Sequence, residues 1–320
     1  HTRYWRDWSS DVCSSDLSSG AGDDCYASGG CGLGAAVAWA ATQTGHLVRL
    51  ELGEGEYQLG EPLTFDGSVG ASEVVLSAPM GAEVVLRPSS RRRLQSGATA
   101  SAALLNVSAG VVILERVQLR AASGVPAVVV TGGQLTMRSC TLADHAAGAL
   151  HVSGGTVTIE DSVLLDNSAP RGGAISVVGG SVTATRTRFE NNTATNEGGA
   201  LHVSAAGHAV LSNGTLLLGN TAPAGASVWR AGGLLDYALP APLGRWLLAG
   251  DGVAELTLQQ YDDDLPFACA PGVYGDSFEP AQQSGPTCSG ACPKGSFCPS
   301  QCTTPGIECV KGAYCEAGSP

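Results

Sequence analysis

Ala127-Val-Val-Val-Thr-Gly-Gly133 is the stretch that decides the fold, because the chain repeats it three times. The later copies are Ala149-Leu-His-Val-Ser-Gly-Gly155, Ala174-Ile-Ser-Val-Val-Gly-Gly180 and Ala200-Leu-His-Val-Ser-Ala-Ala-Gly207. Their first residues lie 22, 25 and 26 positions apart, and a repeat of this length indicates a solenoid.

Apolar and polar residues alternate inside each unit, which is typical of a strand with one buried face. The alignment gives three inward columns: Val128/Val130, Leu150/Val152, Ile175/Val177 and Leu201/Val203; then Leu135/Met137, Val157/Ile159, Val182/Ala184 and Ala209/Leu211; then Leu142, Leu164, Phe189 and Leu217. Neither the leucine spacing of a leucine-rich repeat nor the 3.6-residue period of a helical array is present. The pattern predicts an all-β, right-handed, single-stranded parallel β-helix of about eight coils.

Asn167, Asn192 and Asn220 take the same place in successive coils, and His145 takes it in the preceding coil. Coils of a parallel β-helix stack about 4.8 Å apart. The side chains can therefore form a ladder of amides that satisfies backbone groups at one corner. We expect these residues to support the fold rather than to bind a ligand.

A pair of glycines stands at the start of two of the coils. We expect these glycines to form corners: Gly172, Gly173, Gly198 and Gly199. Gly172-Gly-Ala-Ile175, Gly198-Gly-Ala-Leu201 and Phe189-Glu-Asn-Asn192 resemble the repeat of the polymorphic outer-membrane protein family, over about three coils. The resemblance implies the β-helical passenger of a surface-exposed protein. Leu47-Val-Arg-Leu-Glu-Leu52, with the turn after it, resembles the first strand of pectin-lyase-like proteins.

The composition favours a solenoid over a globular enzyme core, because 44 of the 320 residues are glycine and only 5% are aromatic. The formal net charge of −12 argues against a nucleic acid or an anionic membrane as partner. No apolar run reaches the length that a membrane span needs. Asn106, Asn191 and Asn213 each begin an Asn-x-Ser/Thr sequence, which permits glycosylation.

Eleven cysteines are present, and most of them lie near the C-terminal end. Those expected in disulfides are Cys25, Cys31, Cys269, Cys288, Cys292, Cys298, Cys302, Cys309 and Cys315, and one of the last seven must remain over. Zinc is the alternative, disfavoured because no histidine follows His208 and no Cys-x-x-Cys occurs. Disulfides imply an oxidising compartment, and hence a secreted or cell-surface protein.

Cys140 stands apart from this group. It aligns with Ser162 and Thr187 at an inward position of the repeat. No other cysteine belongs to the repeat, so we expect Cys140 to be buried and unpaired.

Five segments are expected along the chain. Residues 1–17 resemble translated sequencing-adapter read-through, and residues 18–46 cap the N-terminal end with a helix from Leu33 to Thr42. Residues 47–235 form the β-helix, in which Val111 to Leu119 is expected to be one strand and Arg91-Arg-Arg93 a solvated turn. Residues 236–264 form a C-terminal cap, with Trp246, Leu247 and Leu248 over the last coil, and a polar linker in which Asp262-Asp-Asp264 is expected to be a solvated hinge rather than a calcium site. Residues 265–320 form a cysteine-rich module. The module, from Cys269-x-Pro-Gly-x-Tyr-Gly275 onwards, resembles the ephrin-receptor-like and growth-factor-receptor-like modules of cell-surface proteins. Both ends of the sequence look truncated.

Asp144 and Asp166 are the candidates for a catalytic pair, because they take equivalent places in adjacent coils. Carboxylates about one coil spacing apart can share a calcium ion. Arg138 and Arg171 are the basic candidates for proton abstraction. The next coil offers only Asn191, and the paired-aspartate, Gly-His-Gly and Arg-x-Lys signatures of the polygalacturonases are absent. We therefore expect a polar corner, with no catalytic residue, cofactor or resident metal.

His151 and His202 also share one place in the repeat, with Ser176 between them. Two coils separate the histidines by about 10 Å, which is too far for one metal ion to bind both rings. We expect both to be exposed strand residues.

Three classes of function follow. The first is a non-catalytic surface protein whose β-helix displays a long face for adhesion or matrix contact, with a carbohydrate or protein surface as ligand. The second is a secreted polysaccharide-active enzyme, resembling pectate lyases or glycoside hydrolases. The third is the ectodomain of a receptor that meets the membrane only through a segment outside this sequence. Because the fold alone carries no chemistry, the first is favoured.

Overall fold

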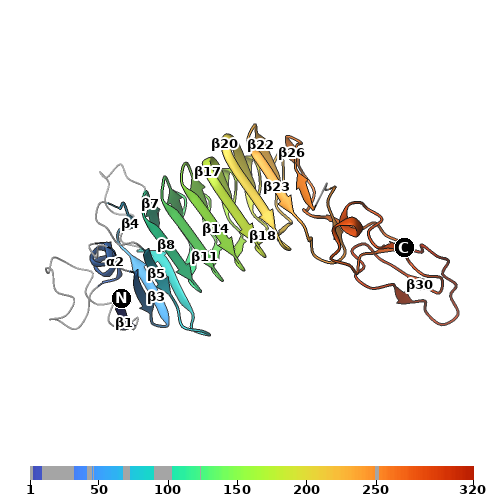
Figure 1. The fold of residues 1–320 in the computed structure, drawn as a ribbon, viewed down its shortest axis with the longest axis horizontal. Helices are drawn as coiled ribbons and strands as arrows, with labels where there is room; N and C mark the ends of the chain where they lie inside the picture. Colours follow the sequence, from blue (N-terminus) through green and yellow to red (C-terminus); the bar gives the residue numbers. More distant parts are fainter. Residues whose placement is uncertain are drawn as a thin grey trace.

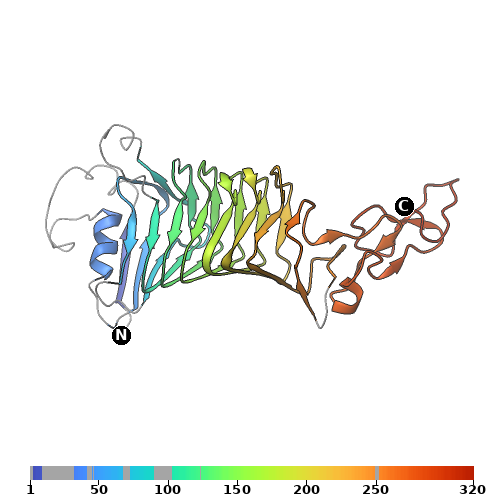
Figure 2. The same cartoon turned by 90° about the horizontal axis from the view of Figure 1, so that it is seen from above.

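The computed structural model of the chain describes residues 3–8, 32–41, 45, 47–67, 73–89, 103–122, 124–248 and 252–320. Within them the protein is an elongated stack of short strands, with helix α2 (Leu33–Ala41) at one end and the cysteine-rich module at the other (Figures 1 and 2). Each strand of the stack pairs in parallel with the strand at the same place in the next coil. The fold is a parallel β-solenoid.

Three columns of strands form the faces of the solenoid. Face 1 contains β2 (Leu47–Leu52), β5 (Glu73–Ser77), β8 (Val111–Glu115), β11 (Gln134–Arg138), β14 (Thr156–Glu160), the second halves of β17 (Ile175–Thr185) and β20 (Leu201–Ser212), and β23 (Leu234–Ala238). Face 2 contains β3 (Gly55–Leu59), β6 (Val84–Pro88), β9 (Gln118–Arg120), β12 (Thr141–Ala143), β15 (Val163–Leu165), β18 (Arg188–Glu190) and β21 (Leu216–Leu218). Face 3 contains β4 (Leu63–Phe65), β7 (Leu105–Val107), β10 (Val128–Val130), β13 (Leu150–Val152), the first halves of β17 and β20, and β22 (Val228–Ala231).

The register stacks the inward columns that the sequence predicts. Leu142 pairs with Leu164, Leu164 with Phe189, and Phe189 with Leu217. Residues of all three columns are at most 2% exposed and share one continuous core. The predicted parallel β-helix is confirmed, although the 7-stranded face 2 gives about seven coils rather than about eight.

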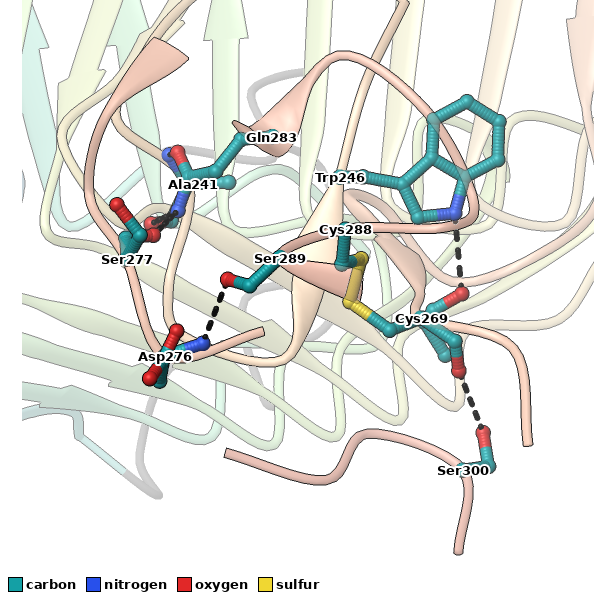
Figure 3. Close-up of a disulfide and its surroundings, with 10 residues drawn as sticks. Ala241, Trp246, Cys269, Asp276, Ser277, Gln283, Cys288, Ser289 and Ser300 are labelled. Atoms are coloured by element: carbon teal, nitrogen blue, oxygen red, sulfur yellow. Dashed lines mark hydrogen bonds between the residues drawn. A yellow bond between two sulfur atoms is a disulfide. The ribbon is translucent and has the colours of Figure 1, made fainter. Parts of the chain in front are cut away.

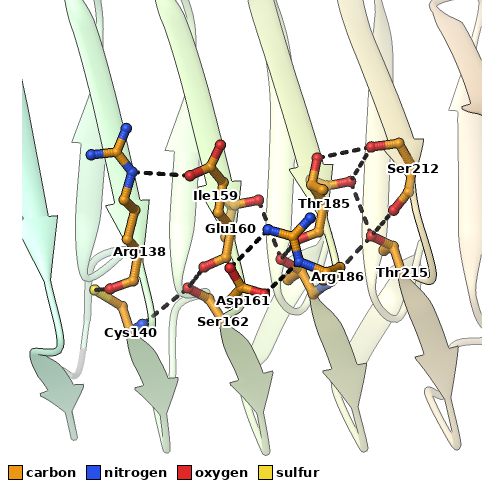
Figure 4. Close-up of polar contacts among 12 residues, drawn as sticks. Arg138, Cys140, Ile159, Glu160, Asp161, Ser162, Thr185, Arg186, Ser212 and Thr215 are labelled. Carbon is orange, nitrogen blue, oxygen red and sulfur yellow. Dashed lines mark hydrogen bonds and ion pairs between the residues drawn. The ribbon is translucent and has the colours of Figure 1, made fainter.

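The corner between faces 1 and 2, here the hydroxyl corner, is held by side-chain hydroxyls (Figure 4). The Cys140 N–H donates to Oγ of Ser162 at 3.0 Å, and the Thr187 N–H donates to Oγ1 of Thr215 at 3.4 Å. The Ser162 hydroxyl donates in turn to the carbonyl of Glu160 at 2.7 Å. These bonds satisfy backbone groups that a corner would otherwise leave unpaired inside the protein.

A left-handed residue begins each hydroxyl corner: Arg116, Ser139, Asp161, Arg186 and Asn213 all have φ between 43° and 61°. The sequence predicts a single strand from Val111 to Leu119, and this prediction is wrong. The chain turns a corner at Arg116, which divides the segment into β8 on face 1 and β9 on face 2.

The corner between faces 2 and 3, here the asparagine corner, is followed by a segment of variable length. Leu150 comes five positions after His145, whereas Ile175 comes eight positions after Asn167. The additional residues form β16 (Ser168–Arg171), which pairs in parallel with β19 (Thr193–Glu197) of the next coil. Added length at this corner leaves the three faces in register.

At the N-terminal end, α2 places Leu33, Ala36, Val37 and Ala40 in the core, which is the helical face that the sequence predicts. Strand β1 (Arg3–Trp8) pairs in parallel with β2. That strand lies in the segment that resembles adapter sequence, and its pairing does not bear on the origin of those residues. Cys13, Cys25, Cys31 and Arg91 to Arg93 lie outside the described residues.

A returning segment covers the C-terminal end of the solenoid. β25 (Val253–Glu255) and β26 (Gln260–Tyr261) pair antiparallel with β23 and β22, which blocks the open edge of the sheet. The Asp264 carboxylate accepts the Gly219 N–H at 2.9 Å, and the Asp262 carboxylate accepts the Ala226 N–H at 3.1 Å. These aspartates are exposed to solvent, as expected, but their bonds to the last coil mean that the segment is not a free hinge.

Leu247 is buried in the core at this end, but Leu248, also expected to cover the last coil, is exposed. Strand β24 (Arg245–Trp246) pairs antiparallel with β27 (Phe267–Ala268) at the boundary to the module. Trp246 packs against Phe267 with ring centroids 5.3 Å apart.

Three disulfides hold the module: Cys269–Cys288, Cys292–Cys298 and Cys309–Cys315. Cys302 is a buried free thiol, so its assignment to a disulfide is wrong. The other elements are short: β28 (Val273–Tyr274) pairs with β29 (Gly290–Ala291), β30 (Ser296–Phe297) pairs with β31 (Ile307–Glu308), and a 3-10 helix spans Pro280–Gln283.

Gln283 joins the module to the solenoid (Figure 3). Its buried amide accepts the Ala241 N–H at 2.7 Å and donates to the Ala241 carbonyl at 2.8 Å. Arg245, also buried, donates to the Pro266 carbonyl and to the Gln301 amide oxygen. Because buried hydrogen bonds are costly to break, these contacts tie the module to the segment that follows the last strand of the solenoid.

Candidate functional site

Asp144 and Asp166 lie at successive positions of the asparagine corner, directly before His145 and Asn167. Both are left-handed, with φ of 62° and 54°, a conformation that aspartate tolerates better than most residues. The Asp144 carboxylate accepts from Arg120 at 3.2 Å, and its side chain is 54% exposed. Corner geometry therefore accounts for both aspartates.

Arg138 is not brought to this pair. It ends β11 on face 1, whereas the two aspartates follow strands of face 2. Its guanidinium donates to Glu160 at 3.0 Å and lies 3.6 Å from Glu115. The hydrogen bond to Glu160 raises the pKa of Arg138, so the side chain stays protonated and is not suited to remove a proton.

His202 differs from its prediction, because it is only 4% exposed. Glu197 folds back over it, with its carboxylate 3.6 Å from Nε2, and Trp229 takes the same outward place in the next coil. Burial lowers the pKa of His202. Its Nδ1 atom has no hydrogen-bond partner among the described residues.

His151, two coils away, is half-buried, and burial lowers its pKa as well. Within the described part of the chain, no group of three His, Cys, Asp or Glu side chains is placed to hold a metal ion. The two histidines of face 3 therefore do not form a joint site.

The asparagines form a continuous chain of buried amides. The N–H and Nδ2 of Asn167 both donate to Oδ1 of Asn192, at 3.1 and 2.9 Å. The same two donors of Asn192 bond to Oδ1 of Asn220, at 2.9 and 3.0 Å. Nδ2 of Asn192 also donates to the Leu164 carbonyl at 2.9 Å.

His145 continues this chain in the preceding coil. Its Nδ1 accepts the Ala122 N–H at 2.9 Å, so Nε2 carries the proton and donates to the Leu119 carbonyl at 3.0 Å. Burial lowers the pKa of His145 to about 4. The ring is therefore neutral and takes the place of an amide.

Gly172 and Gly198 occupy the start of face 3 with φ of 61° and 67°. A Cβ atom at Gly172 would lie 2.2 Å from the Ile175 carbonyl oxygen, and one at Gly198 would lie 2.4 Å from that of Leu201. Gly173 and Gly199 face the backbone of the next coil as closely, at 2.3 Å from the Gly199 oxygen and 2.1 Å from the Ala226 oxygen. Only glycine fits at these positions.

A different part of the molecule has the character of a contact surface. Thr136, Thr158 and Thr183 lie in register at the centre of face 1, on three consecutive coils. We call them the threonine row. They continue between Ile113 on one side and Val210 on the other, so five β-branched side chains follow one another.

The hydroxyls of the threonine row have no hydrogen-bond partner among the residues that the structure describes, whereas those of the hydroxyl corner all bond to backbone groups. β-Branched side chains on a pleated sheet have few rotamers, so the three hydroxyls are held about 4.8 Å apart. Ion pairs such as Arg138–Glu160 border the row on one side (Figure 4). The row is an ordered set of free donors and acceptors.

The sequence predicts a long contact face without saying which face it is, and it does contain a signal for this row. Thr136, Thr158 and Thr183 lie between the paired inward residues of the second column, so the same period of two places them outward. Their lack of partners, in contrast, requires the structure. The bonds from the hydroxyls of Ser162, Thr187 and Thr215 to backbone groups likewise emerge only from the structure.

The model for the Chlamydia polymorphic membrane protein repeat matches residues 186–204. The match runs from the hydroxyl corner through Phe189 and Asn192 to Gly198 and Gly199, the residues whose packing is described above. No curated protein and no solved structure matches the chain. The described residues contain no helix both long and apolar enough to cross a membrane. The repeat and the solenoid fit a surface-displayed protein of the polymorphic-membrane type.

Proposed function

We propose that this chain is a non-catalytic surface protein whose solenoid holds face 1 towards an external ligand. The observation that carries the proposal is the threonine row, with three partnerless hydroxyls at a fixed spacing on a rigid sheet of the described residues. Disulfides in the module support an extracellular location. The partial match to a surface-protein repeat supports the same location.

The ligand chemistry that suits this row is a polymer with regularly spaced hydroxyl or amide groups, such as a wall or matrix polysaccharide. Each threonine hydroxyl can donate one hydrogen bond and accept two. The hydroxyls are uncharged, and the charged side chains that border the row, such as Arg138 and Glu160, are paired with one another, which favours a neutral polymer over a charged one. The proposal does not require a cleft, because a sheet can align with an extended chain along its length.

Binding is tested by sedimentation of the purified full chain with insoluble cellulose, chitin and β-glucan. The test variant replaces Thr136, Thr158 and Thr183 together with valine, which keeps the β-branched shape and removes the hydroxyls. At about 0.5–1.5 kcal/mol for each hydrogen bond, binding should weaken at least tenfold.

Thr141→Val is the matched control, since Thr141 is an outward threonine on face 2 with no side-chain hydrogen bond to the described residues. It should bind as the unmodified chain does. Equal binding of the triple variant and the unmodified chain, or no binding to any of the three polymers, contradicts the proposal.

A further inference from the structure

An apolar groove lies where the last coil meets the segment that leads to the module. Its volume is about 390 Å³, and its walls include Asn213, Leu216, Pro240, Pro242 and Phe278. Phe278 is 59% exposed, which leaves its ring available to a ligand. Arg186 also borders the groove, but Nε and Nη2 of its guanidinium already donate to the Asp161 carboxylate, at 2.6 and 2.9 Å.

Asn213 begins one of the three Asn-x-Ser/Thr sequences, with Gly214 and Thr215 after it. The structure distinguishes the three asparagines. Asn106 lies in the middle of β7, between Thr64 and Val129 on the neighbouring coils. Asn213 is exposed at the hydroxyl corner, and its side chain has no hydrogen bond to the described residues.

Asn191 is exposed as well, but its Oδ1 lies against the next coil, 2.8 Å from where a Cβ of Gly219 would stand. Asn213, in contrast, lines the apolar groove of the described residues. A substituent on its side-chain nitrogen therefore has a surface to pack against as well as room to extend into solvent.

We propose that Asn213 carries an N-linked glycan whose first sugar packs in this groove against Phe278. In the transfer, Nδ2 of Asn213 bonds to the anomeric carbon of a sugar carried on a lipid pyrophosphate. The bond from that carbon to the pyrophosphate oxygen breaks, the lipid pyrophosphate leaves, and a base of the transferase takes the proton from Nδ2. The reaction precedes folding, so the later burial of the Thr215 hydroxyl does not oppose it.

Two physical features make a sugar the occupant of the groove. A pyranose ring has an apolar C–H face that suits an aromatic ring and prolines, and hydroxyls at its edge that remain in water. The volume lies near the lower end of the roughly 300–1,000 Å³ found for small-ligand sites, which suits a ring or two rather than a longer chain. The groove walls come from the hydroxyl corner, face 2 and residues 240–243, so the glycan leaves face 1 uncovered.

To test occupancy, the full chain is expressed in eukaryotic cells as a secreted protein. The peptides that contain the three asparagines are then analysed by mass spectrometry for attached glycan. We expect Asn213 to be occupied. An unmodified Asn213 in the secreted, folded protein overturns the proposal, whatever is found at the other two sites. Binding to polysaccharide is measured separately, so this result is independent of the threonine row.

Packing in the groove is tested with an endoglycosidase that leaves one sugar on the asparagine. The single sugar should keep the unfolding midpoint above that of Asn213→Gly, which removes the acceptor while accepting the positive φ of 43°. In Phe278→Ala, the same sugar should give no increase. Packing against Phe278 is refuted if the sugar raises the unfolding midpoint in Phe278→Ala as well. It is also refuted if the sugar does not raise the midpoint of the chain that retains Phe278.

Discussion

The solenoid and the cysteine-rich module keep their chains ordered in different ways. The solenoid has one large core of stacked aliphatic residues, in which Cys140 is a free thiol. The core of the module consists of Cys292, Cys298 and Cys302 with Tyr274 packed against them. Repetition provides apolar burial and in-register hydrogen bonds in the first region, whereas covalent bonds replace burial in the second.

Reduction of the disulfides should unfold the module and leave the solenoid folded, and this is the largest effect that we expect. A disulfide in a small domain contributes about 2–4 kcal/mol, and the module has little other core. We expect dithiothreitol to make residues beyond 269 sensitive to protease while the β-sheet circular dichroism of the solenoid persists. Loss of that signal on reduction would show that the two regions unfold together.

Asn192→Ala should be the most damaging single substitution within the ladder. It leaves the buried Asn167 N–H and the Leu164 carbonyl without partners, at about 1–3 kcal/mol for each group. We expect a loss of about 2–6 kcal/mol in the free energy of unfolding, measured with denaturant. Thr193→Ala is the control, because its hydroxyl bonds only to Thr221 at the surface. Equal losses in the two variants would argue against the ladder.

His145 should make the solenoid sensitive to acid. Its pKa is about 4 in the folded protein and about 6.5 in an unfolded chain, so the unfolded state binds the proton more readily. The stability present above pH 6.5 is therefore lost as pH falls towards 4, by up to about 3 kcal/mol. His145→Asn supplies an amide like that of Asn167 and should remove this part of the pH dependence. Identical pH profiles of the two proteins would contradict it.

The two free thiols of the described residues, Cys140 and Cys302, should report on the two regions separately. Cys140 is buried, which raises its pKa to about 11 and leaves almost no thiolate at pH 8. Iodoacetamide should label Cys302 once the disulfides are reduced, and Cys140 only in denaturant. Cys140→Ser should cost less than about 1 kcal/mol, because Ser162 holds the same place in the next coil. Labelling of Cys140 after reduction alone would indicate that the solenoid opens with the module.

The smallest effect that we expect is in assays of polysaccharide cleavage, in which the chain should show no activity. A lyase needs a base near the proton that it removes, and a hydrolase needs two carboxyl groups at a set separation. Asp144 is paired with Arg120, and Arg138 lies on another face. We expect no unsaturated products or new reducing ends from pectate or alginate, with or without calcium. Activity that disappears in Asp166→Ala would establish the enzymatic alternative.

The inward columns could be predicted from the sequence because a strict period of two fixes which side chain faces the core. The break at Arg116 could not, since arginine gives no signal for a left-handed corner. The burial of His202 depends on Glu197 and Trp229, which reach it from other segments. The contacts of Asp262 and Asp264 depend on the chain returning to the last coil. These outcomes follow from tertiary contacts that a local pattern does not contain.

The variable segment after the asparagine corner has a consequence for how such a protein can diversify. Residues added there, as between Asn167 and Ile175, lengthen the connection from face 2 to face 3 while the three faces stay in register. The corner is therefore a natural insertion point, where new sequence can be grafted onto one coil while its neighbours keep their alignment. A family of such chains could vary the loops along this edge and conserve the scaffold, much as antibodies vary their binding loops on a constant framework.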